Sequence, residues 1–226
     1  MKKETIQLNK IYQKDAILLL RMIDNNFIDL VLTDIPYEKV NKKSNGLRNL
    51  DKGEANKKTF ELRDFLVEID RVTRGSGYIF CGKEQISEIF DYFNSKNYSV
   101  RLMIWEKTNP SPMNSKHVWL SGVESFIYFK KRGATFNEKY KNTVIKMPNG
   151  SSKIHLTQKP LKLFEYLIDV SSNKGDIVLD PCVGSGTTAV ASKKKARNFI
   201  VGDINKKYCQ MTEKRIKDYD IQEKLF

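Results

Sequence analysis

Short apolar runs alternate with helix-patterned segments along most of this chain. Runs rich in β-branched and aromatic residues, typical of buried strands, lie at 10–13, 29–32, 78–81, 100–105, 125–129, 177–179 and 199–201. Helical spacing of apolar residues fills most of the intervals, at 16–25, 59–72, 84–94, 160–171, 187–194 and 205–219. Because strands that alternate with helices pair in parallel between two helical layers, the pattern predicts a doubly wound α/β fold with a mostly parallel, seven-stranded sheet. The fourth and fifth runs are joined without a helical pattern, so they are expected to form an antiparallel edge.

The length and charge of the chain limit its organisation and its partners. With 226 residues it is long enough for one α/β domain with a sizeable core and short for two, so we expect a single domain over 1–226. Its net charge is +13, an excess that usually reflects a polyanionic partner, with solubility as the alternative explanation. Charge alone therefore leaves nucleic acid open as a partner without establishing it.

The excess charge gathers in two segments of low apolar content. Segment 38–58 carries Lys39, Lys42, Lys43, Arg48, Lys52, Lys57 and Lys58, and segment 130–153 carries Lys130, Lys131, Arg132, Lys139, Lys141, Lys146 and Lys153. Irregular loops of this length in a compact domain usually either have a function or are disordered. Both segments are therefore predicted to be basic loops and candidates for contact with nucleic acid.

The cysteine and histidine content argues against a metal centre. Cys81, Cys182 and Cys209 show no C-x-x-C spacing, and the only histidines in the sequence are His117 and His155, so we expect neither a disulfide framework nor a bound metal. The N-terminus lacks an apolar signal core, and no stretch reaches the ~18 apolar residues of a membrane span. The protein is therefore expected to be soluble and cytoplasmic, with no membrane partner.

A glycine turn follows the sixth apolar run. Asp180 would end that strand, Gly184 and Gly186 allow a tight turn, and Thr187 begins a helix whose N-terminal dipole favours a negative group. This arrangement suits a cofactor that carries an amine, a carboxylate and a nucleoside. The turn also matches the loose dinucleotide fingerprint, with Asp203 at the spacing expected for ribose hydroxyls, so a dehydrogenase stays open on the loop alone. An acid directly before the turn would face a pyrophosphate unfavourably, which favours the first cofactor.

A second polar segment, Asp34-Ile35-Pro36-Tyr37, directly follows the apolar run at 29–32. Its carboxylate would lie at the carboxyl end of a strand, where open α/β sheets bind ligands. The amino group of a base is a poor nucleophile because its lone pair is delocalised into the ring, and acceptors for both N–H groups return electron density to the nitrogen. Asp34 and the carbonyl of Ile35 can supply these acceptors, while Tyr37 can stack on the ring. The segment therefore predicts a site for a planar base that carries an amino group.

Both segments resemble motifs of amino-directed DNA methyltransferases that use S-adenosylmethionine, and their order, catalytic motif before cofactor loop, resembles the β group of that family. Segments 11–15, 155–160 and 199–205 are similar to further elements of the family. The resemblance implies a class I, Rossmann-like methyltransferase fold in permuted order, with S-adenosylmethionine as the cofactor. It implies a catalytic motif of Asp34, Ile35, Pro36 and Tyr37, and a cofactor site of Asp15, Thr157, Lys159, Asp180, Cys182, Gly184, Ser185, Gly186, Thr187, Asp203 and Ile204.

The same resemblance implies a reaction and a substrate. It implies methyl transfer to N6 of a flipped adenine in double-stranded DNA, because the family associates serine at the position of Asp34 with N4 of cytosine. Methylation of N4 of cytosine or of adenine in RNA stays an alternative, as does a catalytically silent nucleic-acid-binding protein. A role in restriction–modification is expected, and a homodimer stays possible.

Two features of the sequence depart from the family pattern or admit a second interpretation. Ile35 replaces the first proline of the family's Asp-Pro-Pro-Tyr, which removes one φ restraint and adds an N–H group. Segment 105–110 also resembles the family, and its Asn109-Pro110 turn could line the pocket for the target base. Trp105 at the start of that segment is equally well explained as a core aromatic residue.

Overall fold

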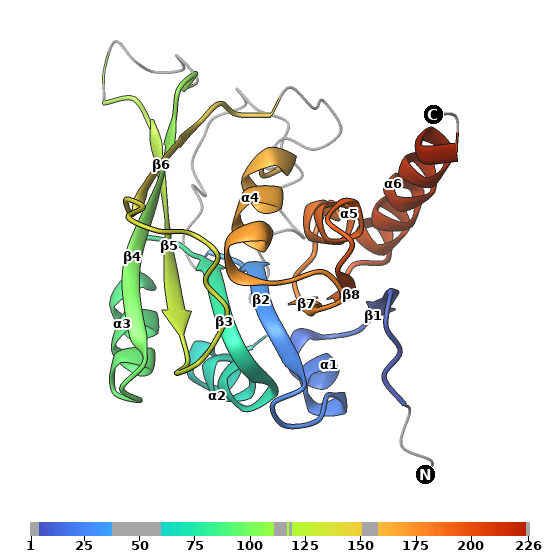
Figure 1. Ribbon diagram of the computed structural model, residues 1–226, viewed down its shortest axis with the longest axis horizontal. Helices are drawn as coiled ribbons and strands as arrows, with labels where there is room; N and C mark the ends of the chain where they lie inside the picture. The colour runs from blue at the N-terminus through green and yellow to red at the C-terminus, as the bar shows by residue number, and fades with distance from the viewer. Residues whose placement is uncertain (1–4, 38–59, 111–116, 118, 151–157, 225–226) are drawn as a thin grey trace.

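The computed structural model describes residues 5–37, 60–110, 117, 119–150 and 158–224. They form an eight-stranded sheet with the strand order β1-β8-β7-β2-β3-β5-β4-β6. The strands are β1 (Lys10–Gln13), β2 (Ile28–Asp34), β3 (Thr73–Phe80), β4 (Ser99–Lys107), β5 (Val123–Lys130), β6 (Val144–Met147), β7 (Ile177–Asp180) and β8 (Asn198–Asp203). The sheet crosses the whole molecule, from β6 on one side to β1 on the other (Figure 1).

Among the described strands, only β5 runs against its neighbours. It pairs antiparallel with β3 and β4, whereas the other pairs in the sheet are parallel. The mostly parallel α/β fold is thus confirmed with two differences: the sheet has eight strands rather than seven, and the antiparallel strand lies inside it rather than at its edge. The additional strand, β6, covers the edge at β4 and lies within segment 130–153, which the sequence predicted to be a loop. Its four residues are only alternately half-buried, too short a pattern to stand out from the basic residues around it.

Helices cover both faces of the sheet. One layer contains α1 (Ala16–Met22), α2 (Leu62–Val72) and α3 (Ile86–Asn94), and the other contains α4 (Leu161–Ser171), α5 (Thr187–Lys194) and α6 (Lys206–Lys224). None of the described helices is long and apolar enough to cross a membrane.

The central strand β2 has a core on each side. Val31 joins the core beneath α1, α2 and α3, whereas Leu30 and Leu32 join the core beneath α4 and α5. All three side chains are fully buried. Burial on both faces explains why β2 reads as a continuous apolar run rather than as an alternating one.

The strand β3 is longer than the apolar run that predicted it, because it begins at Thr73, directly where α2 ends. Its first five residues are two glycines and three polar residues, so the apolar pattern of the sequence does not reveal this part of the strand. A Cβ atom at Gly75 would lie 1.9 Å from the carbonyl oxygen of Asp29 in β2. Glycine therefore permits the close backbone approach with which the two strands begin to pair.

The winding of the chain reverses between β7 and β2. From β2 the chain passes through α2 to β3 on one side, and from β7 it passes through α5 to β8 on the other. The strands β2 and β7 pair directly, with Val31 opposite Leu179. Open α/β sheets bind ligands at the carboxyl ends of the strands at such a point. The motif that begins at Asp34 and the glycine turn after Asp180 therefore follow neighbouring strands, as the permuted motif order requires.

The direction of β5 decides which charged residues lie near these strand ends. Glu124, near the start of β5, lies opposite Trp105 at the carboxyl end of β4. Lys130, at the end of β5, lies opposite Ser76 and Ser99, near the amino ends of β3 and β4. Segment 130–153 therefore begins at the strand ends that lie away from Asp34. The strand β6 then runs parallel to β4 and returns to the side of the sheet where β4 ends.

Candidate active site

The catalytic motif begins at the carboxyl end of β2. The side chain of Asp34 accepts a hydrogen bond at Oδ1 from the hydroxyl of Tyr37 (3.0 Å) and one at Oδ2 from Nζ of Lys159 (2.7 Å). Burial raises the pKa of the Asp34 carboxyl, and the ammonium group of Lys159 only partly offsets this. The structure therefore brings the Asp34 carboxylate, the Tyr37 hydroxyl and the buried ammonium group of Lys159 into direct contact.

The turn after Asp34 is fixed by hydrogen bonds that the sequence did not predict. The N–H of Ile35 donates to the carbonyl of Phe80 in β3 (3.1 Å), a bond that proline at this position would lack. The carbonyl of Pro36 accepts from the side-chain amide of Gln85 (3.1 Å), whose Oε1 in turn accepts from the N–H of Gly82 (2.8 Å). Gln85 is buried, so its amide is held in place. The φ restraint that Ile35 lacks is thus replaced by contacts with β3 and the turn that follows it.

Lys159 lies between two carboxylates. Besides Asp34 it contacts Oε2 of Glu124 (3.0 Å), and the other oxygen of Glu124 pairs with Nζ of Lys107 (2.7 Å). Burial alone would lower the pKa of the Lys159 ammonium group, but Asp34, Tyr37 and Glu124 outweigh burial and raise it well above its usual value. Burial would raise the pKa of Glu124, yet the two lysines lower it. Lys159, predicted to belong to the cofactor site, therefore contacts the carboxylate of Asp34, and Glu124 and Lys107 join this cluster of charges.

The acid before the glycine turn faces the protein interior. Asp180 is 2% exposed, and its Oδ1 accepts from the hydroxyl of Thr33 (2.7 Å) and the N–H of Cys182 (3.1 Å). Its Oδ2 accepts from the hydroxyl of Thr188 (2.5 Å). Burial raises the pKa of the Asp180 carboxyl to about 7, against the effect of these donors. Asp180 thus links β2, β7 and α5 beneath the turn, and its place in the cofactor site stays a prediction.

The glycine turn itself leaves room for a ligand. Gly184 has φ +50°, and a Cβ atom placed on it would have no atom within 4 Å. Gly186, with φ +84°, begins α5 without a side-chain cap, so N–H groups of the first helical turn stay available to an acceptor. Ser185 and Thr187 are held from behind by Arg215, whose guanidinium contacts the Ser185 carbonyl and both side-chain hydroxyls. An open turn at a helix N-terminus fits the carboxylate of an amino-acid cofactor.

Two further acids lie at the ends of β8 and β1. Asp203 accepts from the N–H of Gly184 (3.0 Å) and the N–H of Asn205 (2.8 Å), so it supports the glycine turn while remaining partly exposed. Asp15 caps α1 by accepting from the N–H of Ile17 (2.9 Å). Because Gln13 pairs with Asp203, these two acids lie at neighbouring strand ends. Ile204 follows as an apolar side chain that is 54% exposed, a position open to the nucleoside end of a cofactor.

Three of the predicted features fall outside the described residues, and the role of Trp105 is decided. Thr157, His155 and segment 38–58 belong to the part of the chain that the structure does not describe. Trp105 is 1% exposed and donates from Nε1 to the carbonyl of Met147 (2.9 Å), so it is a core residue.

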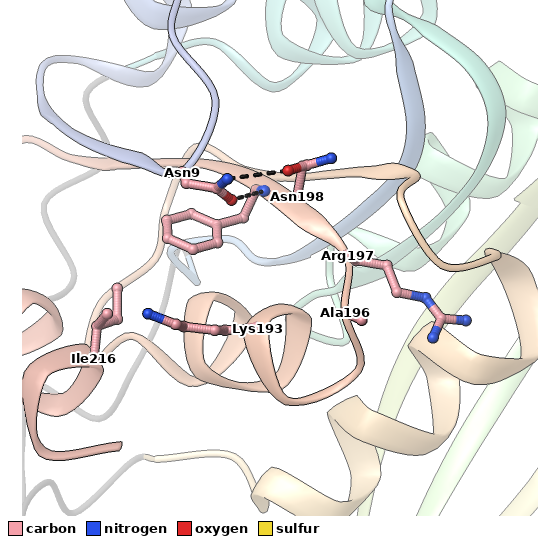
Figure 2. A pocket seen from close by; sticks show the side chains of 7 residues that line it. Asn9, Lys193, Ala196, Arg197, Asn198 and Ile216 are labelled. Carbon is pink, nitrogen blue, oxygen red and sulfur yellow. Dashed lines mark hydrogen bonds between the residues drawn. The ribbon is translucent and has the colours of Figure 1, made fainter. Parts of the chain in front are cut away.

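A cavity of about 390 Å³ lies elsewhere, at the amino end of β8. Asn9, one of the residues that line it, forms a hydrogen bond with the side chain of Asn198 (Figure 2) and accepts another from the backbone N–H of Phe199. Its two cationic residues, Lys193 and Arg197, are paired with Asp220 and Asp169. The cavity is at the opposite end of the strand from Asp203 and is not part of the site described above.

The fold and the two adjacent motifs define a class I methyltransferase. The DNA methylase family of N6- and N4-directed enzymes matches residues 28–214, and the chain belongs to this family. The type II methyltransferase M.HpaI of Haemophilus parainfluenzae is 33% identical over 229 residues, covering 89% of this chain and 72% of the relative. The crystal structure of the M1.HpyAVI–SAM complex has a TM-score of 0.70 at 29% identity and covers 91% of this chain and 98% of that one. The cytosine-N4-specific PvuII methyltransferase, at 16% identity, shares the fold with a TM-score of 0.71 over 93% of this chain and 87% of that one.

Proposed function

We propose that this protein transfers the methyl group of S-adenosylmethionine to N6 of a flipped adenine in double-stranded DNA, as the modification enzyme of a restriction–modification system. The observation that carries the proposal is the adjacency of Asp34 and the open glycine turn, which follow the paired strands β2 and β7. The acceptor for the amino group of the base therefore lies beside the binding site for the methyl donor. The family associates serine at the position of Asp34 with methylation of cytosine, so the aspartate at this position supports adenine as the target base. A DNA substrate agrees with a cytoplasmic location.

The residues at the end of β2 act on the target base. Asp34 accepts one N–H of the amino group and the carbonyl of Ile35 accepts the other, which returns electron density to the nitrogen as the methyl group arrives. Tyr37 stacks on the ring once the base has left the duplex. The Tyr37 hydroxyl, which donates to Oδ1 of Asp34, gives up or shares this oxygen when the base docks. Catalysis then rests on position and hydrogen bonding, with no covalent bond to the protein.

The residues that would hold the cofactor surround the glycine turn. Gly184, Ser185 and Gly186 form the open turn, Thr187 starts the helix whose N-terminus receives the carboxylate, and Asp203 accepts from the ribose. Asp15 and Ile204 lie at the nucleoside end, with Cys182 and Asp180 beneath the turn. When bound, S-adenosylmethionine supplies an electrophilic methyl group. The chain supplies its orientation.

Nucleoside mass spectrometry of duplex DNA treated with the protein tests the proposal, which expects N6-methyladenine. Asp34→Ala should reduce methyl transfer by at least ~100-fold, the scale of one positioned polar group in a transition state. The variant should keep its affinity for S-adenosylmethionine, and Lys159 should stay paired because Glu124 remains beside it. N4-methylcytosine alone would change the base assignment. Full activity in Asp34→Ala would place the chemistry elsewhere.

A further inference from the structure

Four side chains from different parts of the chain form a row of alternating charge across the ends of β4, β5 and β2. Nζ of Lys107 lies 2.7 Å from Oε1 of Glu124, Oε2 of Glu124 lies 3.0 Å from Nζ of Lys159, and Nζ of Lys159 lies 2.7 Å from Oδ2 of Asp34. The four side chains are 13%, 28%, 8% and 31% exposed in that order. Ion pairs that are shielded to this degree are screened much less than surface pairs, so each charge acts on the next.

The ion pair between Lys159 and Asp34 affects how well Asp34 can accept a hydrogen bond, and Glu124 limits this effect. A buried ammonium group paired with Asp34 alone would commit one oxygen of that carboxylate and neutralise its charge, which weakens it as an acceptor for the target base. Glu124 gives Lys159 a second anionic partner. Within the described residues Oε2 of Glu124 has no hydrogen-bond donor of good geometry, although Lys159 is only 3.0 Å away. Glu124 therefore acts on Lys159 chiefly through its charge.

We propose that Glu124, anchored by Lys107, is a positioning residue for methyl transfer: it holds the ammonium group of Lys159 between two carboxylates and so keeps Asp34 an effective acceptor for the amino group of the target base. The inference rests on the proposed function, because it takes the role of Asp34 from there. Glu124 does not touch the base. It acts through Lys159.

The charged and titratable groups around Asp34 show what the loss of Glu124 would do. They come from several elements, namely Tyr37, Cys81, Glu124, Lys159, Asp180 and Cys182. Among the interactions that act on Asp34, the charge of Glu124 raises its pKa and the charge of Lys159 lowers it. Without Glu124, the pKa of Asp34 therefore falls. Since the ionised carboxylate is the acceptor, kcat rises with pH through this pKa, and the acid limb of the kcat profile moves to lower pH.

The test compares methylation of duplex DNA by the wild-type protein and by Glu124→Gln over a range of pH. The variant should lose roughly 10- to 100-fold in kcat, the cost of displacing a group that orients the reaction, while its affinity for S-adenosylmethionine is unchanged. Its acid limb should lie at lower pH. Glu124→Asp, which keeps the charge, should recover part of kcat and keep the wild-type acid limb. Lys107→Met, which leaves Glu124 anchored at one end only, should give a smaller loss of kcat.

Glu165→Gln is the matched control. Glu165 on α4 is a shielded carboxylate, 17% exposed, that pairs with Lys194 of α5 (2.8 Å) and does not contact the site. Its substitution should leave kcat and the acid limb unchanged. An NMR titration of the Asp34 carboxyl carbon gives a readout that needs no catalysis, and it should show a lower pKa in Glu124→Gln than in the wild-type protein.

The possible failures are separable. If the wild-type protein methylates no DNA, the proposed function is wrong and the inference falls with it. If the wild-type protein is active and Glu124→Gln keeps its kcat, the inference alone is wrong. The inference alone is also wrong if Glu124→Gln loses kcat but neither its acid limb nor the Asp34 titration moves, because the loss would then be only structural.

Discussion

Asp180 shows how one buried residue serves the fold at a cost in free energy. Its carboxyl group is almost fully enclosed and receives three hydrogen bonds, from Thr33, Cys182 and Thr188. The donors do not compensate for the lost hydration of the charge, so its pKa is raised to about 7. A carboxyl group whose pKa is higher in the folded state than in the unfolded state destabilises the fold as the pH rises between the two values. This group therefore favours the fold most below about pH 4, and the fold loses stability as the pH rises from there toward 7.

Asp180→Asn should remove this pH dependence. The asparagine keeps an acceptor for Thr33 and Cys182, while the hydroxyl of Thr188 can accept from its amide and donate to the carbonyl of Leu32, 3.3 Å away. Asparagine cannot ionise, so between about pH 4 and pH 8 the variant should gain stability relative to the wild-type protein by an amount on the order of 4 kcal/mol. Urea unfolding at several pH values measures the difference. A difference that does not vary with pH would mean that Asp180 is ionised in the fold without penalty.

At the scale of elements, the turn that follows Asp34 depends on how β2 pairs with β3. The hydrogen bond from Ile35 to the carbonyl of Phe80 continues the pairing of the two strands by one residue beyond Asp34. The Ile35 side chain is 2% exposed and packs in the core beneath α1, α2 and α3. Ile35, which departs from the family's motif, therefore stabilises this fold through a backbone hydrogen bond and through a buried side chain.

Replacing Ile35 by the family's proline should weaken the pairing of β2 with β3 at this position. Ile35→Pro removes the N–H and leaves the buried carbonyl of Phe80 without its donor, which costs about 1–3 kcal/mol, only partly offset by the stiffer unfolded chain. Ile35→Val keeps the N–H and should cost about 0.5–1.5 kcal/mol. Chemical denaturation of both variants checks the order. If Ile35→Pro were the more stable of the two, the bond to Phe80 would contribute nothing.

The sequence predicted those parts of the fold and site that local chemistry specifies. The alternation of strands and helices predicted the doubly wound sheet, and Asp34 and the glycine turn were apparent because each stands at the end of a buried apolar run. Glu124 could not be found in this way, because its place beside Lys159 depends on the direction of β5, which brings the start of that strand to the edge where β2 ends. The strand β6 was not predicted because its four residues are too few to show a pattern. The contact of Lys159 with Asp34 was not predicted because it joins residues that are 125 positions apart in the sequence.

At the scale of the whole molecule, the two basic segments differ in where they join the described part of the fold. Segment 38–58, with seven lysines and arginines, directly follows Tyr37 in the sequence and lies outside the described residues. Segment 130–153 begins at the far edge of the sheet, and three of its lysines are paired with carboxylates: Lys131 with Asp70, Lys141 with Glu138, and Lys146 with Glu106. DNA that presents a base to Asp34 should therefore depend on the first segment more than on the start of the second.

Paired charge-reversal variants measure this asymmetry. Lys42→Glu with Lys43→Glu should weaken DNA binding and reduce the slope of log K against log salt by up to about 0.9 for each phosphate that the protein no longer neutralises. Lys130→Glu with Arg132→Glu makes the same change in net charge at the far edge and is the matched control. Fluorescence anisotropy with duplex DNA over a salt series gives both slopes. If the two variants show the same reduction in slope, binding follows net charge alone; a reduced slope in the first variant only would place the duplex against the edge that carries Asp34, because counterion release reports only those phosphates that the protein contacts.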